Sequence, residues 1–144
     1  MLRMNSLYFS DPVLERCLEA FMGAHAASQR AISRGLNRES SLLSEDVRFM
    51  VDCSDICWVC SGFVLRNSTL PADFARACAE LCEKCADICS DLGEDSEVKS
   101  YEAAFRECAA ACQAFVGENF HTARLSTVDN DLGESLMSDN STPH

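Results

Sequence analysis

The chain has 144 residues, of which 47% are hydrophobic and 24% are charged, and its formal net charge at pH 7 is -11. This length and composition suit one domain with a sizeable core, and the negative charge argues against nucleic acid as a partner, because phosphate binding requires clustered Lys and Arg. No apolar run approaches the ~18 residues of a membrane-spanning helix, so a membrane partner is not expected either.

The ten cysteines are the feature that most needs an explanation. The first residues, MLRMNSLYFS, lack the long apolar stretch and the cleavage site of a secretory signal, so we expect a cytoplasmic protein. Disulfide frameworks belong mainly to small secreted domains that are rich in loops. In a reducing compartment, clustered cysteines more often bind metal or carry out redox chemistry.

The first predicted helix spans residues 10–35. Ser10 or Asp11 is suited to cap its start, Pro12 to occupy its first turn and Gly35 to end it. Its inner face holds a single cysteine and is formed by Leu14, Cys17, Phe21, Ala24, Ser28 and Ala31, with His25 beside it.

The second predicted helix runs from Ser44 to about Arg66, with Glu45 and Asp46 near the positive end of its dipole. Polar residues 67–69 then interrupt the pattern. The inner face follows a spacing of three and four residues and is formed by Met50, Cys53, Cys57, Cys60 and Val64.

The third predicted helix begins at Pro71 and ends at Gly93. Its cysteines are spaced 4, 3 and 4 residues apart, so their thiols form one stripe that is roughly 16 Å long. Charged residues lie between the cysteines and away from the stripe. The inner face of this amphipathic helix is therefore sulfur, and it consists of Cys78, Cys82, Cys85 and Cys89.

The fourth predicted helix follows a turn at residues 94–96 and runs to about Gly117. Its inner face is formed by Tyr101, Phe105, Cys108, Cys112 and Phe115. Beyond Glu118 the composition shifts to Ser, Thr, Asp and Asn. We therefore expect residues 1–117 to form a cysteine-lined bundle and residues 118–144 to form an acidic, mostly disordered tail.

Four amphipathic helices of about 20 residues with short connections predict an all-α protein, an antiparallel up-down-up-down four-helix bundle. In this arrangement the inner faces of the second, third and fourth helices converge. Nine cysteines then line one core.

Cysteines four residues apart on a helix are poorly placed for a disulfide, which needs Cβ atoms about 3.5–4.5 Å apart. They are well placed to bind a soft cation together, and thiolates favour Cu(I), Zn and iron–sulfur clusters. A buried thiolate is costly without a cation. A tube of thiols therefore indicates several bound ions.

Other uses of the cysteines stay open at this point. Buried cysteine packs like a small hydrophobic residue, so the thiols of a structural or interaction bundle need only fill its core. Thiolates in fours also suit the cubane clusters of an iron–sulfur electron carrier. The pair Cys57 and Cys60 has the spacing of dithiol oxidoreductases, but those motifs lie at helix N-termini beside strands, which disfavours redox catalysis here.

The pattern resembles the cysteine-rich four-helix-bundle copper-binding proteins, which include the bacterial copper storage proteins. The resemblance covers roughly residues 11–117 and rests on DCSDICWVC (52–60), CAELCEKCADIC (78–89) and CAAAC (108–112). It implies a non-enzymatic protein that binds many Cu(I) ions through Cys-x-x-x-Cys pairs and assembles as a tetramer. The ligands that it implies are Cys53, Cys57, Cys60, Cys78, Cys82, Cys85, Cys89, Cys108 and Cys112.

The chain departs from that family in the number of its thiols. The first helix has Phe21, Ala24, Ser28 and Ala31 where further cysteines are expected, and the fourth helix has aromatic residues at such positions. Large aromatic side chains plug the ends of the tube, so we expect a reduced copper capacity, with iron–sulfur clusters or Zn as the alternative metals. Cys17 and His25 are additional candidates for metal contact.

Overall fold

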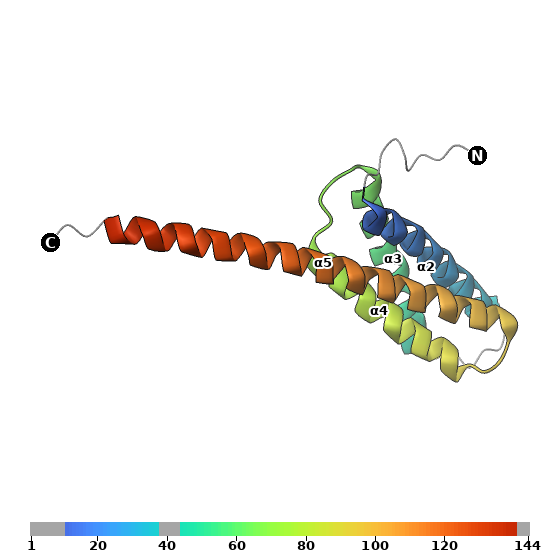
Figure 1. Cartoon of the computed structure of the whole chain (residues 1–144). Helices are drawn as coiled ribbons and strands as arrows, with labels where there is room; N and C mark the ends of the chain where they lie inside the picture. The colour runs from blue at the N-terminus through green and yellow to red at the C-terminus, as the bar shows by residue number, and fades with distance from the viewer. Residues whose placement is uncertain (1–10, 38–43, 141–144) are drawn as a thin grey trace.

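The structure, a computed structural model, describes the backbone of residues 11–37 and 44–140 and the side chains of residues 11–35 and 44–118. Within these ranges the chain forms four α-helices, which are α2 (Pro12–Asn37), α3 (Ser44–Leu65), α4 (Ala72–Asp91) and α5 (Ser96–Asn140). Each helix packs against the next, and α5 also packs against α2, so α3 and α5 lie diagonally opposite each other (Figure 1). The predicted all-α, antiparallel up-down-up-down four-helix bundle is confirmed.

Local hydrogen bonds define the ends of the helices. The Asp11 carboxylate accepts a hydrogen bond in the first turn of α2, as expected of a residue that caps a helix. After α3, Asn67 has a φ of 56°, and the N–H groups of Asn67 and Ser68 donate to the carbonyls of Val64 and Phe63. This left-handed residue with two such bonds is a Schellman motif, which ends the helix and turns the chain toward α4.

The turn between α4 and α5 is tied to α2. Gly93 has a φ of 110°, which favours glycine, and Asp95 accepts hydrogen bonds from the N–H groups of Glu97 and Val98 at the start of α5. The Arg34 guanidinium, near the end of α2, contacts Asp95 at 2.7 Å and Glu97 at 2.9 Å. Arg34 and these backbone hydrogen bonds lower the pKa of Asp95 to about 2.

The fourth helix is longer than the sequence predicted. α5 continues through Gly117 to Asn140 as one helix, and its last part extends past the ends of the other helices (Figure 1). A single glycine inside a helix costs only about 1 kcal/mol relative to alanine, so Gly117 is not sufficient to end it. The structure thus continues α5 through the polar residues after 118 as far as Asn140. The division of the chain into a bundle and a mostly disordered tail at residue 117 stays a prediction.

The predicted inner faces form the core. All the positions assigned to the inner faces of α3, α4 and α5 are buried, as are those of α2 except for the half-buried Leu14. The buried hydroxyls of Ser28 and Ser61 donate to the carbonyls of Ala24 and Cys57 at 2.8 Å, which satisfies them within their own helices.

Among the described residues, no helix combines the length and the apolar character needed to cross a membrane.

Replacing Asp95 with Ala should lower the melting temperature at neutral pH by several degrees, because it removes the cap of α5 and the partner of Arg34. Glu94→Ala is the matched control, since this carboxylate is 91% exposed and should contribute little. The stabilisation by Asp95 is complete above pH 3.8, the ordinary pKa of an aspartate, and is lost as the pH falls through about 2. Thermal denaturation followed by circular dichroism at pH 7, 4 and 2 tests this, and an unchanged melting temperature at pH 7 contradicts it.

Candidate metal centre

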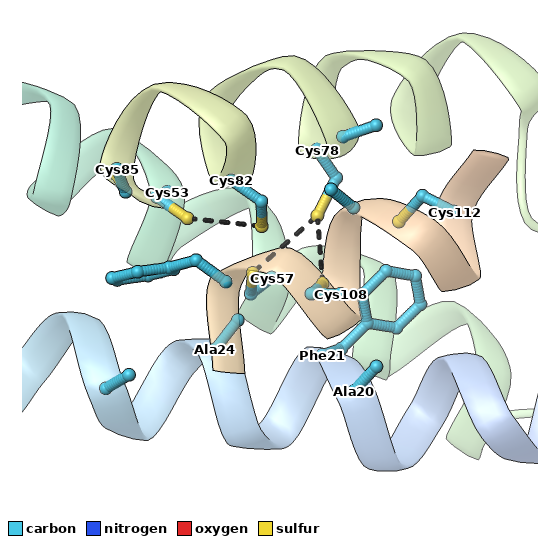
Figure 2. Packing of buried hydrophobic residues seen from close by; sticks show 14 of the residues in the cluster. Ala20, Phe21, Ala24, Cys53, Cys57, Cys78, Cys82, Cys85, Cys108 and Cys112 are labelled. Carbon is cyan, nitrogen blue, oxygen red and sulfur yellow. Dashed lines mark hydrogen bonds between the residues drawn. The ribbon is translucent and has the colours of Figure 1, made fainter. Parts of the chain in front are cut away.

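All ten cysteines are free and buried. Those of α3, α4 and α5 are buried in one core. Figure 2 shows several of their sulfur atoms between the helices, among them those of Cys57, Cys78 and Cys108. The sequence pattern explains this arrangement, because cysteines spaced by three and four residues lie on one side of each helix. The three sulfur faces therefore meet along the axis of the bundle.

Four thiols form the tightest cluster in the described part of the chain. The Sγ atoms of Cys57, Cys78, Cys82 and Cys108 all lie within 4.8 Å of one another. Cys57 and Cys108 lie 3.6 and 3.9 Å from Cys78, measured between Sγ atoms (Figure 2). A tetrahedral ion with metal–sulfur bonds of about 2.3 Å holds its sulfurs roughly 3.8 Å apart. The helices therefore hold these thiols at a spacing that suits shared soft cations.

The remaining predicted thiols extend this cluster along the bundle. The Sγ of Cys53 lies 3.6 Å from that of Cys82, toward one end of the core. The Cys85 thiol donates to the carbonyl of Phe49, and the Cys60 thiol donates to the carbonyl of Phe74. The thiols of Cys85 and Cys60 thus lie on either side of the four-thiol cluster along the bundle, and each donates its proton to a backbone carbonyl.

Neighbouring thiols change one another's acidity within the cluster. Hydrogen bonds from Cys108, and then from Cys112 and Cys57, lower the pKa of the Cys78 thiol. A hydrogen bond from Cys112 lowers the pKa of Cys108 to about 6. The thiols that donate are held in their protonated form, and the pKa of Cys112 is raised by its hydrogen bond to Cys108. The cluster therefore stabilises negative charge at Cys78 and Cys108, whereas hydrogen bonds, to Cys108 first of all, raise the pKa of Cys57 and of Cys82 and keep protons there that a cation can displace.

The thiols of Cys17 and Cys89 form no hydrogen bond with another thiol of the described residues. Cys17 is the one cysteine of α2, and its thiol donates to the carbonyl of Ala111 at 3.4 Å. Burial, with a smaller effect of Cys108, raises its pKa to about 12. Burial, together with a smaller contribution from the carboxylate of Glu102 on α5, also raises the pKa of Cys89 to about 12. The structure thus brings eight of the nine predicted ligands into one network and places Cys89 at its edge.

α2 forms a wall of the core without thiol ligands. Phe21 and Ala24 are completely buried on this side, and the ring of Phe21 lies beside Cys108 in Figure 2. Ser28 is also fully buried. Hydrogen bonds from neighbouring thiols, that of Cys57 first, lower the pKa of Cys53, and the Ser28 hydroxyl adds a smaller decrease. Helical spacing places Ser28 on the inner face without marking its hydroxyl as part of the site. The signal that identifies it is a serine at an inner position that faces cysteines.

His25 lies outside the sulfur core. Its Nδ1 is 3.0 Å from both the carbonyl and the hydroxyl oxygen of Ser54, and its ring lies against Trp58 with the centroids 5.3 Å apart. The Gln29 amide donates to the same hydroxyl at 2.7 Å. The structure therefore places this candidate residue on the outer edge of the α2–α3 contact and not beside the clustered thiols.

Cys17 should make the metal-free, reduced protein sensitive to alkaline pH. The stabilisation that comes from this raised pKa is complete below pH 9.0, the ordinary pKa of a thiol, and is lost as the pH rises through about 12. Between pH 8 and 10.5, Cys17 should account for about 2 kcal/mol of lost stability. Denaturant unfolding of the wild type and Cys17→Ala at both pH values measures this difference, and equal losses in the two proteins argue against it.

Comparisons with known proteins agree with this geometry. The family model for Csp, copper storage protein, matches residues 10–117. A solved structure titled "Cu(I)-bound Copper Storage Protein BsCsp3" matches with a TM-score of 0.62 and 25% sequence identity, covering 71% of this chain and 96% of that chain. A search among curated proteins gives no match. Because the family model spans the whole cysteine-lined bundle, this chain belongs to the copper storage protein family.

Proposed function

We propose that this protein stores copper by binding several Cu(I) ions between the thiolates of α3, α4 and α5. The observation that carries the proposal is the group of four Sγ atoms within 4.8 Å of one another, in a member of the copper storage family. Thiolates are soft ligands that suit Cu(I). The solved relative is itself described as Cu(I)-bound, which favours copper over the iron–sulfur and zinc alternatives.

The proposed ligands fall into a centre and two extensions. Cys57, Cys78, Cys82 and Cys108 form the centre, because their sulfur atoms are already grouped. The extensions contain the other five predicted ligands, which are Cys53, Cys60, Cys85, Cys89 and Cys112. Cys17 stays outside the proposed set because it is the one cysteine of α2 and has no Cys-x-x-x-Cys partner there. His25 stays outside it because its ring bonds to Ser54.

The proposed role is copper binding rather than catalysis. We place the protein in the cytoplasm and expect it to be a homo-oligomer, which the family resemblance suggests is a tetramer. The capacity of the core should be limited, because α2 contributes Phe21 and Ala24 where a thiol-bearing helix contributes ligands. The completely buried Phe105 of α5 limits it further. Each of these side chains occupies space next to the sulfur atoms without offering a donor.

Anaerobic titration of the reduced protein with Cu(I) should give several tightly bound ions per chain and a colourless product. Cys78→Ser should lower the stoichiometry, because Cys78 is close to both Cys57 and Cys108. Cys89→Ser is the matched control and should lower it less, since this thiol lies at the edge of the network. Bound copper is measured by atomic absorption after gel filtration. An equal stoichiometry in wild type and Cys78→Ser excludes the proposed centre, and a brown, iron-rich starting protein favours the iron–sulfur alternative.

Copper binding should also raise the melting temperature strongly. A ligand that binds only the folded state at 1,000 times its dissociation constant adds about 4 kcal/mol to the free energy of unfolding. Calorimetry of the metal-free and loaded protein measures this increase, and a Cu(I) chelator should reverse it. If the cysteines only fill the core, neither copper nor chelator changes the melting temperature.

A further inference from the structure

The sulfur contacts between α3 and α4 repeat along the bundle in a regular register. The Sγ atoms of Cys57 and Cys78 lie 3.6 Å apart, and those of Cys53 and Cys82 also lie 3.6 Å apart, one helical turn farther on (Figure 2). The second contact is displaced by four residues on each helix, backward on α3 and forward on α4, as expected of antiparallel neighbours. Sulfur therefore meets sulfur at both of these inward levels.

The next inward level of the same register holds Met50 opposite Cys85. Both residues lie three positions beyond the previous contact, Met50 before Cys53 on α3 and Cys85 after Cys82 on α4. The Cys85 thiol donates to the carbonyl of Phe49 at 3.5 Å, which places this thiol beside the turn of α3 that carries Met50. Met50 is completely buried in the same core. The sulfur row of α3 thus continues past Cys53 with a thioether in place of a thiol.

The two other helices offer no sulfur at this end of the core. The end lies toward the turn between α4 and α5, which Arg34 joins to α2. The inward residues there are Ala31 of α2 and Tyr101 of α5, and both are buried. A soft cation that binds Cys85 and reaches across to this turn of α3 therefore has the Met50 sulfur as its soft ligand.

The chemistry of a thioether suits this position. Thioether sulfur carries no charge, so Cu(I) held by the Cys85 thiolate and the Met50 sulfur forms a neutral unit, whereas two thiolates leave the unit with a negative charge. A neutral group costs less to bury than a charged one. Thioethers are soft donors that suit Cu(I), whereas zinc is bound by thiolate, imidazole and carboxylate ligands.

We propose that Met50 binds Cu(I) together with Cys85, across the contact between α3 and α4. Binding releases the proton of Cys85, and Met50 has no proton to lose. This ligand adds a thioether to the nine predicted thiolates and gives its end of the row a preference for Cu(I) over zinc. The proposal rests on the proposed copper-storage function, but its failure can be measured separately from the failure of that function.

Selenomethionine labelling tests the assignment directly. The chain has five methionines, so the labelled, Cu(I)-loaded protein should show selenium–copper scattering at the selenium absorption edge for one selenium atom in five. Met50→Leu, which nearly keeps the volume and the apolar character of the side chain, should abolish this scattering. Met22→Leu is the matched control and should retain it, because Met22 is 55% exposed on α2.

Scattering that survives in Met50→Leu overturns the assignment of Met50 and leaves copper storage intact. The same conclusion follows if a wild type that has bound copper shows no selenium–copper scattering. A wild type that binds no Cu(I) overturns both this proposal and the storage function. Bound copper is therefore counted on the same samples.

Metal affinity gives a second readout that a packing role would not produce. Loss of an outer-shell partner typically lowers metal affinity by roughly 10–100-fold, so Met50→Leu should weaken the binding of Cu(I) at this end by about tenfold or more. Competition with a Cu(I) chelator measures this change. The affinity for Zn(II), titrated in the same two proteins, should stay unchanged. An unaltered Cu(I) affinity, or an equal loss for both metals, overturns the proposal.

Discussion

The structure depends on how the protons of buried thiols are held. A thiolate without a partner is costly inside a protein, and a thiol in an apolar site resists losing its proton. The bundle meets this constraint in two ways. At its centre, thiols donate to one another, which lowers the pKa of Cys78, and at its margins they donate to backbone carbonyls, as Cys17 and Cys85 do. The centre is therefore suited to exchange protons for a soft cation, and Cys17 is suited to packing.

The fold follows from the sequence because three independent signals agree. The spacing of cysteines and apolar residues identifies the inner faces, the residues around Asp11, Pro71 and Gly93 mark helix ends, and short connections require antiparallel neighbours. The length of α5 did not follow, because a glycine and a polar composition weaken helix propensity without preventing a helix.

The sequence predicts which face of each helix carries the candidate ligands, but it does not predict the distances between their sulfur atoms. Helical spacing places Cys57, Cys78 and Cys108 on inward sides, yet only the rotation and axial shift of the helices bring their sulfur atoms together. The same limit applies to His25, whose position beside the inner face left its direction undetermined. Its hydrogen bonds to Ser54 settle that direction, and they depend on how closely α2 approaches α3.

The absence of a clustered thiol on α2 has a mechanical consequence for the loaded protein. In the proposed loaded protein, copper bound between thiolates would join α3, α4 and α5, whereas α2 is held by the packing of its alanine and phenylalanine side chains and by Arg34. The metal would thus act as a set of removable cross-links among three helices and would leave the attachment of the fourth, α2, to side-chain packing. With the proposed ligands, α2 is the helix that could detach without breaking a metal–sulfur bond.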